Sequence, residues 1–205
     1  MENLDIFQEE ESDDGIVFGK PEYWEGLYQN ESIQADWYFD WDDFRSMVIN
    51  YCKASDHVLT LGCGNSKLSE DMLKDGFEKI VNIDISPTVI QKMKEIYKNE
   101  HKLEWFEMDC AKLDFPDNSF DIIIDKGTYD SLLCGANKDS IIGRSCSEVF
   151  RVLKPKGYFF VISFSDPSLI LPAMREFHHK WDLLPPKFIP RDSDPKVYLY
   201  TFEKH

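Results

Sequence analysis

The feature that most constrains this chain is a regular alternation, from about Ser55 onward, of short strand-like runs with longer helical runs. Apolar β-branched residues fill the strand-like runs, whereas the helical runs place apolar residues three or four positions apart. Parallel strands need such crossovers, so the alternation predicts an α/β domain whose parallel sheet is covered on both faces. We expect strands at 57–61, 79–83, 103–108, 120–124 and 158–163, and two more near 182–188 and 196–203.

Helices are expected before and between these strands, at 41–52, 67–75, 139–153 and 168–180. Another should begin at Pro87 with Ser86 as its N-cap, because a Ser–Pro pair is typical of a helix start. Residues 154–157 (KPKG) are predicted to form a turn. Ligands of parallel sheets bind beyond the carboxyl ends of the strands, so we expect the chemistry in the loops after the first four strands.

The charge of the chain is strongly negative, with 38 acidic and 23 basic residues and a formal net charge of −15. Acids crowd the first 14 residues without any Lys or Arg, so we predict an acidic, disordered tail over 1–20 and one domain over 21–205. The charge disfavours nucleic acid and favours a basic protein partner, with solubility alone as the alternative explanation. No apolar run approaches the roughly 18 residues of a membrane span, so no membrane partner is expected.

Cysteine and histidine usage bears on metals and on compartment. The five cysteines are scattered, with no C-x-x-C pair, and the five histidines lack metal-ligand spacing. This pattern argues against a disulfide framework and against a bound metal. It favours a reducing compartment, and we expect a cytoplasmic protein.

Two loops predict a cofactor that contains adenosine. Gly62 and Gly64 follow the first strand directly, and glycines there let the backbone approach a ligand closely. Asp84 directly follows the second strand, where a carboxylate can accept both hydroxyls of a ribose. An NAD-dependent oxidoreductase is an alternative, but Lys67 occupies the position of the third glycine in the dinucleotide fingerprint.

A third loop carries Asp109 and Cys110, of which the acid can hold the exocyclic amine of adenine; a plain turn aspartate is the alternative. The stretches VLTLGCGNS, MDCAKLDFPDNSFDIII and VLKPKGYFFVIS, with Asp84 between the first two, resemble class I methyltransferases in order and spacing. The resemblance implies a doubly wound, seven-stranded Rossmann-like sheet with its last strand antiparallel. It also implies S-adenosylmethionine as methyl donor and S-adenosylhomocysteine as product. Thr60, where most members have an acid, and Ser66, where many have a glycine, depart from the pattern.

A narrower resemblance accounts for both departures. The motifs YWEGLY (23–28), DWY (36–38) and DKGTYD (125–130) are similar to eukaryotic methyltransferases that modify lysine on translation elongation factor 1-alpha, including the type fused to endothelin-converting enzyme. With the loops above, this resemblance implies a set of cofactor contacts: Trp24, Tyr28, Trp37, Gly62, Cys63, Gly64, Asp84, Ile85, Asp109, Cys110 and Lys126. For the three aromatic residues, core packing of a lid helix is the alternative.

The resemblance implies methyl transfer to a protein lysine, with elongation factor 1-alpha as the basic protein partner. Asp125 ends the fourth strand, and we expect it to position the acceptor nitrogen; a carboxylate that caps the next helix is the alternative. Two other functions stay open, a small-molecule methyltransferase and a catalytically inert subunit that binds the cofactor. The absence of a plausible catalytic Tyr-x-x-x-Lys or His–acid arrangement further disfavours an oxidoreductase.

Overall fold

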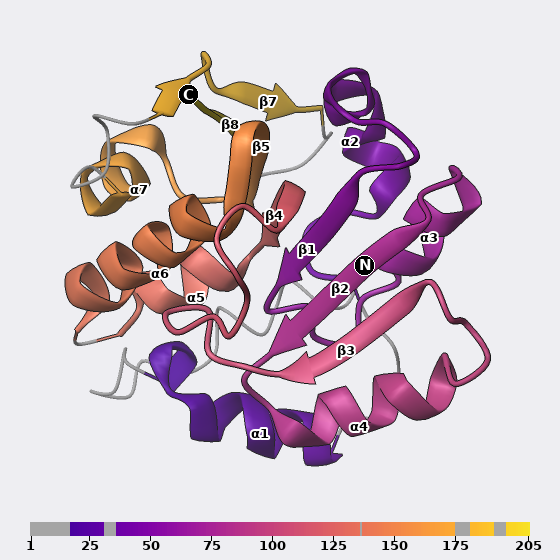
Figure 1. Cartoon of the computed structure of the whole chain (residues 1–205). Coiled ribbons are helices and arrows are strands. Elements are labelled where there is room, and N and C mark those ends of the chain that lie inside the picture. Colours follow the sequence, from indigo (N-terminus) through magenta and orange to yellow (C-terminus); the bar gives the residue numbers. More distant parts are fainter. Residues whose placement is uncertain (1–16, 31–35, 136, 175–180, 191–195) are drawn as a thin grey trace.

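The fold is built on one eight-stranded sheet, in a computed structural model that describes residues 17–30, 36–135, 137–174, 181–190 and 196–205 (Figure 1). The strand order is β3-β2-β1-β4-β5-β8-β6, and β7 also pairs with β8. The strands are β1 His57–Leu61, β2 Lys79–Asp84, β3 Leu103–Glu107, β4 Phe120–Lys126, β5 Leu153–Ser163, β6 Trp181–Leu183, β7 Lys187–Ile189 and β8 Val197–Lys204. The predicted α/β class is confirmed.

Strands β1 to β5 run parallel, and β8, the last strand, runs antiparallel to all three of its neighbours, as predicted. The strand count differs from the prediction of seven. The run at 182–188 is not one strand but parts of two, β6 and β7, which pair with different ends of β8. Pro185 and Pro186 lie between them and have no N–H to donate, which breaks the ladder at that point.

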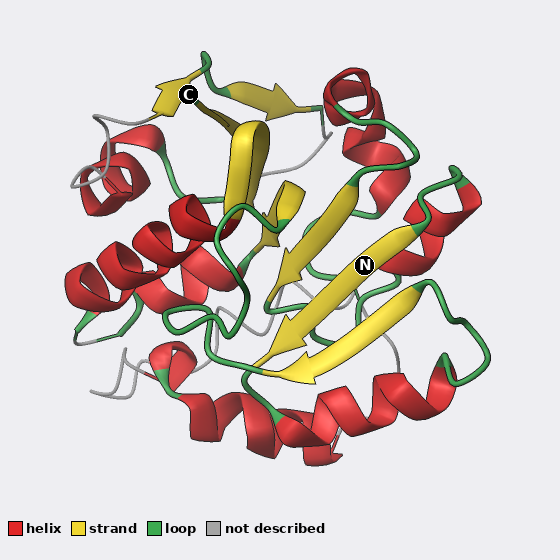
Figure 2. Cartoon of the chain, in the orientation of Figure 1, coloured by secondary structure: helices red, strands yellow, loops and turns green. Residues whose placement is uncertain are grey.

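Helices cover both faces of the sheet (Figure 2), because neighbouring residues of each buried strand point to opposite sides. Ile122 and Ile124 of β4 pack with α2, α3 and α4, whereas Ile123 packs with α5, α6 and α7. The helices are α1 Pro21–Asn30, α2 Trp41–Val48, α3 Leu68–Lys74, α4 Pro87–Ile96, α5 Thr128–Leu133, α6 Lys138–Val152 and α7 Pro167–Met174. Short 3₁₀ turns lie at Val17–Gly19 and Ile49–Tyr51.

Several local predictions are confirmed and others are corrected. Ser86 caps α4 and accepts a hydrogen bond from the Val89 N–H, as expected. The predicted turn at 154–157 is instead part of β5, where Lys156 takes a left-handed conformation (φ 66°) and the pairing with β4 shifts register. Helix α5 was not expected, because six residues are too few to show a helical period.

The ends of the described ranges bear on three other expectations. The turn at Val17–Gly19 contacts α1 and α5, so the fold includes residues ahead of the predicted boundary at 20/21. Residues 1–16, most of the predicted tail, lie outside the described residues, as do 175–180 at the end of the helix expected over 168–180. In the ranges given above, no helix combines the length and apolarity that crossing a membrane requires.

Candidate functional site

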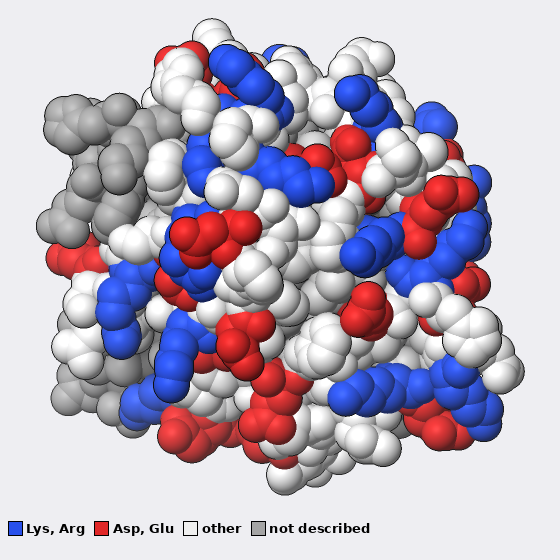
Figure 3. Space-filling model, viewed as in Figure 1, with Lys and Arg blue, Asp and Glu red and all other residues white. Residues whose placement is uncertain are grey.

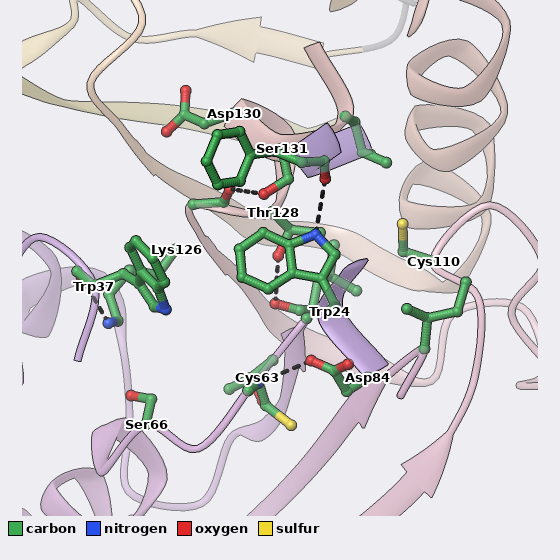
Figure 4. A pocket seen from close by; sticks show the side chains of 18 of the residues that line it. Trp24, Trp37, Cys63, Ser66, Asp84, Cys110, Lys126, Thr128, Asp130 and Ser131 are labelled. Atoms are coloured by element: carbon green, nitrogen blue, oxygen red, sulfur yellow. Dashed lines mark hydrogen bonds between the residues drawn. The ribbon is translucent and has the colours of Figure 1, made fainter. Parts of the chain in front are cut away.

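A pocket lies where β1, β2 and β4 end (Figure 4), at the edge of the sheet that the sequence indicated. The loops after these strands form its floor, and α1 and the segment 36–40 form other walls. All eleven residues predicted to contact a cofactor line it: Trp24, Tyr28, Trp37, Gly62, Cys63, Gly64, Asp84, Ile85, Asp109, Cys110 and Lys126. Asp125 is not among the lining residues.

The glycine loop after β1 leaves no room for side chains. Gly62 and Gly64 have φ values of 52° and 51°, a region that L-residues with a side chain rarely adopt. A Cβ at Gly62 would collide with the Thr128 hydroxyl, and one at Gly64 would lie 2.6 Å from the Tyr28 hydroxyl oxygen. Both glycines are therefore required, by their positive φ and by the side chains of Thr128 and Tyr28 packed against them. The loop they form also lines the pocket.

Asp84 lies at the bottom of the pocket, beside the glycine loop (Figure 4). Its carboxylate accepts hydrogen bonds from the Gly64 N–H and the Ser86 N–H, both at 2.9 Å, and is 6% exposed. Burial raises the pKa of Asp84, and these backbone donors oppose that shift. Because each carboxylate oxygen can accept more than one hydrogen bond, both keep capacity for the hydroxyls of a ligand.

Glu25 holds α1 against the pocket, a role that the sequence analysis missed although it quoted the YWEGLY motif. The Glu25 carboxylate accepts hydrogen bonds from the hydroxyls of Ser86 (2.6 Å) and Thr88 and from the Thr88 N–H at the start of α4. The Ser86 and Thr88 hydroxyls lower the pKa of Glu25 to about 2. Asp84, Ser86 and Glu25 thus form a continuous chain of hydrogen bonds from the pocket floor to α1.

The three predicted aromatic residues pack against one another in the wall of the pocket. The rings of Trp24 and Trp37 lie 5.8 Å apart at 79°, and the Trp24 indole donates to the Phe18 carbonyl at 2.8 Å. Tyr28 lines the pocket and also belongs to the core, with 5% of its surface exposed. Their faces can attract a cation, so packing and ligand contact are compatible for these residues.

Lys126 anchors a segment that we call the strap, residues 36–40. Its ammonium donates to Asp36 Oδ1 and to the Trp37 carbonyl, both at 2.9 Å. The Ser66 hydroxyl and the Lys67 N–H also donate to Asp36. Burial lowers the pKa of Lys126 while Asp36 opposes the shift. Lys126 therefore fixes the pocket wall that carries Trp37, and Ser66 replaces a glycine because it binds the strap.

Thr60, the other departure from the family pattern, is part of a neutral network. Asn82 accepts hydrogen bonds from the hydroxyls of Thr60 (2.6 Å) and Ser69 (2.5 Å), and it donates to the Glu104 carbonyl at 3.3 Å. These contacts join β1, α3, β2 and β3 just below the glycine loop. Hydroxyl and amide groups thereby support the loop without an acid at position 60.

Asp109 and Cys110 line the pocket at the end of β3. Asp109 Oδ1 accepts a hydrogen bond from the Ala111 N–H at 2.8 Å, which forms an Asx turn. Among the described residues, no group of three or more His, Cys, Asp or Glu side chains is placed to hold a metal ion. The expectation of no metal stays a prediction.

Asp125 lies below the pocket surface, with a fully buried side chain. Its Oδ2 accepts from the Tyr129 N–H of α5 at 3.4 Å, and its Oδ1 has no hydrogen-bond partner in the described ranges. Burial and the neighbouring Asp130 raise the pKa of Asp125 to about 8. These contacts fit the alternative role for Asp125, in which its carboxylate holds the start of α5 and does not position the acceptor nitrogen.

The pocket fits an adenosine-containing cofactor on its own features. The glycine loop lines the pocket and has no room for a Cβ at Gly62 or Gly64, and two strand ends present carboxylates. Trp24, Tyr28 and Trp37 form an aromatic wall on the side of α1 and the strap. Polar groups that are few and convergent in an otherwise apolar pocket are typical of cofactor sites.

Comparisons with known proteins agree with this site. A family model described as a methyltransferase domain matches residues 53–188. The human protein named eEF1A lysine and N-terminal methyltransferase is 35% identical over 164 residues, covering 78% of this chain and 24% of its own length. The mouse protein named EEF1A lysine methyltransferase 4 is 31% identical over 172 residues, covering 79% of this chain and 68% of its own. The chain thus spans about a quarter of the first of these relatives.

Solved structures share the fold at low identity. The N-methyltransferase NodS from Bradyrhizobium japonicum WM9, in complex with S-adenosyl-L-homocysteine, has a TM-score of 0.65 at 14% identity and covers 88% of this chain and 98% of its own. The PH0226 protein from Pyrococcus horikoshii OT3 has a TM-score of 0.64 at 20% identity, covering 88% and 99%. The family model and the relatives set the oxidoreductase alternative aside, and by them this chain belongs to the S-adenosylmethionine-dependent methyltransferases.

Proposed function

We propose that this protein transfers a methyl group from S-adenosylmethionine to a lysine side chain of translation elongation factor 1-alpha. The observation that carries the proposal is that nearly four-fifths of the chain matches relatives named for lysine methylation of this factor. The residues of the DKGTYD motif add support, since they join the glycine loop, the strap and α5 at one point of the pocket.

The chain would hold the cofactor through the residues that line the pocket. Asp84 would bind the ribose hydroxyls, Asp109 and the Cys110 N–H the adenine, and the aromatic wall the positive sulfur. When bound, S-adenosylmethionine supplies a methyl group on a sulfonium, which is already activated. The protein therefore has mainly to align the acceptor with that methyl group, as positioning alone can supply a large rate enhancement.

The proposed partner is a basic protein in the cytoplasm. The net charge of −15 would steer a basic surface towards the chain and away from nucleic acid. On the face in Figure 3, acidic and basic side chains are interspersed and do not gather into one patch. All five cysteines are free of disulfides, which fits a reducing compartment. We propose no membrane partner and no metal.

The test uses the purified protein, radiolabelled S-adenosylmethionine and a cytosolic extract, followed by gel electrophoresis. We expect one labelled band at the size of elongation factor 1-alpha, with the label on lysine. Label in the small-molecule fraction would favour a metabolite methyltransferase. Cofactor binding without any labelled product would favour the inert subunit.

For the glycine loop, we expect Gly62→Ala to weaken S-adenosylhomocysteine binding at least 100-fold in calorimetric titration. The added methyl group meets the Thr128 side chain and forces an unfavourable φ. Gly76→Ala is the matched control, since Gly76 also has a positive φ (93°) but open space around its Cβ. It should lose about 1 kcal/mol of stability and bind normally. Equal binding by the two variants would contradict a cradle built on Gly62.

For α1, we expect Glu25→Gln to weaken S-adenosylhomocysteine binding roughly tenfold, because charge-assisted hydrogen bonds to Ser86 and Thr88 hold the helix. The folded pKa of about 2 lies below the ordinary value of 4.5, so this anchor is present above pH 4.5 and is lost only as pH falls towards 2. Glu95→Gln on α4 is the control, because Glu95 contacts only the exposed Lys98. Unchanged affinity in Glu25→Gln would show that α1 does not depend on this contact.

For Asp125, we propose that it holds the start of α5 and does not touch the acceptor. Asp125→Asn should then keep turnover within about threefold of the wild type at pH 7.5. The folded pKa of about 8 lies above the ordinary value of 3.8, so ionisation costs stability progressively between these two pH values. Urea unfolding should therefore show Asp125→Asn gaining stability relative to the wild type from pH 5 to pH 8. A loss of turnover with intact cofactor binding would restore the catalytic role.

A further inference from the structure

We infer that the Tyr38 phenol receives the acceptor amine, with Asp130 as the positioning residue behind it. The inference rests on the proposed function and adds the side chains that would contact the lysine. It assigns a compartment of the pocket, formed by Tyr38, Gly127, Asp130 and Phe164, that is separate from the cofactor contacts named above. We call this compartment the acceptor end.

The ring of Tyr38 is held on both sides. A Cβ at Gly127 would lie 3.0 Å from Tyr38 Cε2, so the ring packs directly on the backbone that only glycine provides there. On the other side the ring of Phe164 stands 5.6 Å away at 70°. Tyr38 itself has a φ of 70°, an unusual conformation for a residue with a large side chain. The strap thus holds one tyrosine in a fixed position at the end of β4.

Asp130 determines how the Tyr38 phenol is used. The Asp130 carboxylate is 4% exposed and accepts hydrogen bonds from the hydroxyls of Ser163 (2.5 Å) and Ser165 (2.6 Å) and from the Phe164 N–H (3.3 Å). The Tyr38 phenol lies near this carboxylate, and burial together with the carboxylate's charge raises the pKa of Tyr38. We expect the phenol to direct its single hydrogen towards Asp130, which would leave the Tyr38 oxygen facing the pocket as an acceptor.

An acceptor oxygen in an aromatic wall suits an amine. The N–H bonds of a primary amine can donate to the Tyr38 oxygen, which leaves the nitrogen lone pair directed elsewhere in the pocket. Burial and the nearby Asp130 raise the pKa of Tyr38, so the phenol stays protonated at physiological pH. The substrate class that fits is a primary amine, such as that of a lysine side chain.

The acceptor end adjoins the glycine loop. Gly127, under the Tyr38 ring, precedes Thr128, whose hydroxyl donates to the Leu61 carbonyl at 3.1 Å. In Figure 4, Asp130 and Asp84 lie at opposite ends of the pocket, with Thr128 and Trp24 between them. An amine at Tyr38 would therefore approach from the side opposite the ribose-binding carboxylate.

The charged groups around Tyr38 come from three elements. Asp130 belongs to α5, Asp125 and Lys126 to β4, and Asp36 to the strap; the neutral thiol of Cys134 follows α5 directly. Lys126 and Asp36 neutralise each other at 2.9 Å, whereas the end of β5 and the two residues after it present hydroxyls and an N–H. Asp130 is therefore the group whose charge an amine at Tyr38 would sense most directly.

The test compares Tyr38→Phe with Tyr51→Phe, which removes a hydroxyl from a tyrosine that packs on Tyr158 outside the pocket. Binding of S-adenosylhomocysteine is measured by calorimetry, and methylation of purified elongation factor 1-alpha is followed from pH 6.5 to 9.5. We expect both variants to bind S-adenosylhomocysteine within twofold of the wild type. Tyr38→Phe should lose at least tenfold in kcat/KM for the protein acceptor, and Tyr51→Phe should not.

The variant Asp130→Asn is tested through the pH dependence of the rate, which a purely structural role of Asp130 would not shift. Removing a negative charge beside the amine lowers the pKa of that amine, so the rising limb of the pH–rate profile should shift to lower pH. An unshifted limb, or unchanged kcat/KM in Tyr38→Phe, would overturn the inference.

Failure of the proposed function is recognised separately. If the wild type does not methylate elongation factor 1-alpha, n-butylamine is titrated at pH 10.5 into the wild type and Tyr38→Phe, each saturated with S-adenosylhomocysteine. At least tenfold weaker binding to the variant would support the amine site under a different substrate. Equal binding, or none to either protein, would overturn it.

Discussion

The ion pair between Lys126 and Asp36 holds together the parts of the chain that the pocket needs. Its two side chains are 6% and 10% exposed, so each charge has lost most of its water. Such a pair is maintained only where further hydrogen bonds satisfy the remaining groups. Here the Trp37 carbonyl, the Ser66 hydroxyl and the Lys67 N–H complete it. Loss of either charge would leave the other buried without compensation.

The pocket wall depends on contacts that are remote in sequence. Asp36 meets a residue 90 positions away, and Glu25 meets Ser86 at a separation of 61. Neither contact changes the local pattern of apolar residues that predicts helices and strands. The sequence could therefore predict β1 at its observed bounds and the cap of α4 by Ser86, since both depend on neighbours along the chain. It could not predict why the motif residues Glu25 and Lys126 are there.

The same reasoning explains which site residues were found. Gly62 and Asp84 stand at strand ends, where a parallel sheet places its ligands, so position in the fold was enough to identify them. Tyr38 and Asp130 were quoted within motifs but received no role, because their significance lies in a contact between the strap and α5. The two prolines after β6 were visible as a loop, yet the pairing of short strands on either side of them depends on β8.

One junction serves both halves of the pocket. Gly127 packs under the strap, and Thr128, its neighbour, closes against Gly62 in the glycine loop. Two adjacent residues at the end of β4 therefore fix the wall of the acceptor end and the edge of the cofactor cradle. Methyl transfer requires alignment of the acceptor with the methyl group more than it requires acid or base groups. A rigid junction between the two compartments would fix that alignment. The buried contacts of Asp125 with α5, directly beneath this junction, contribute to the same rigidity without reaching the pocket.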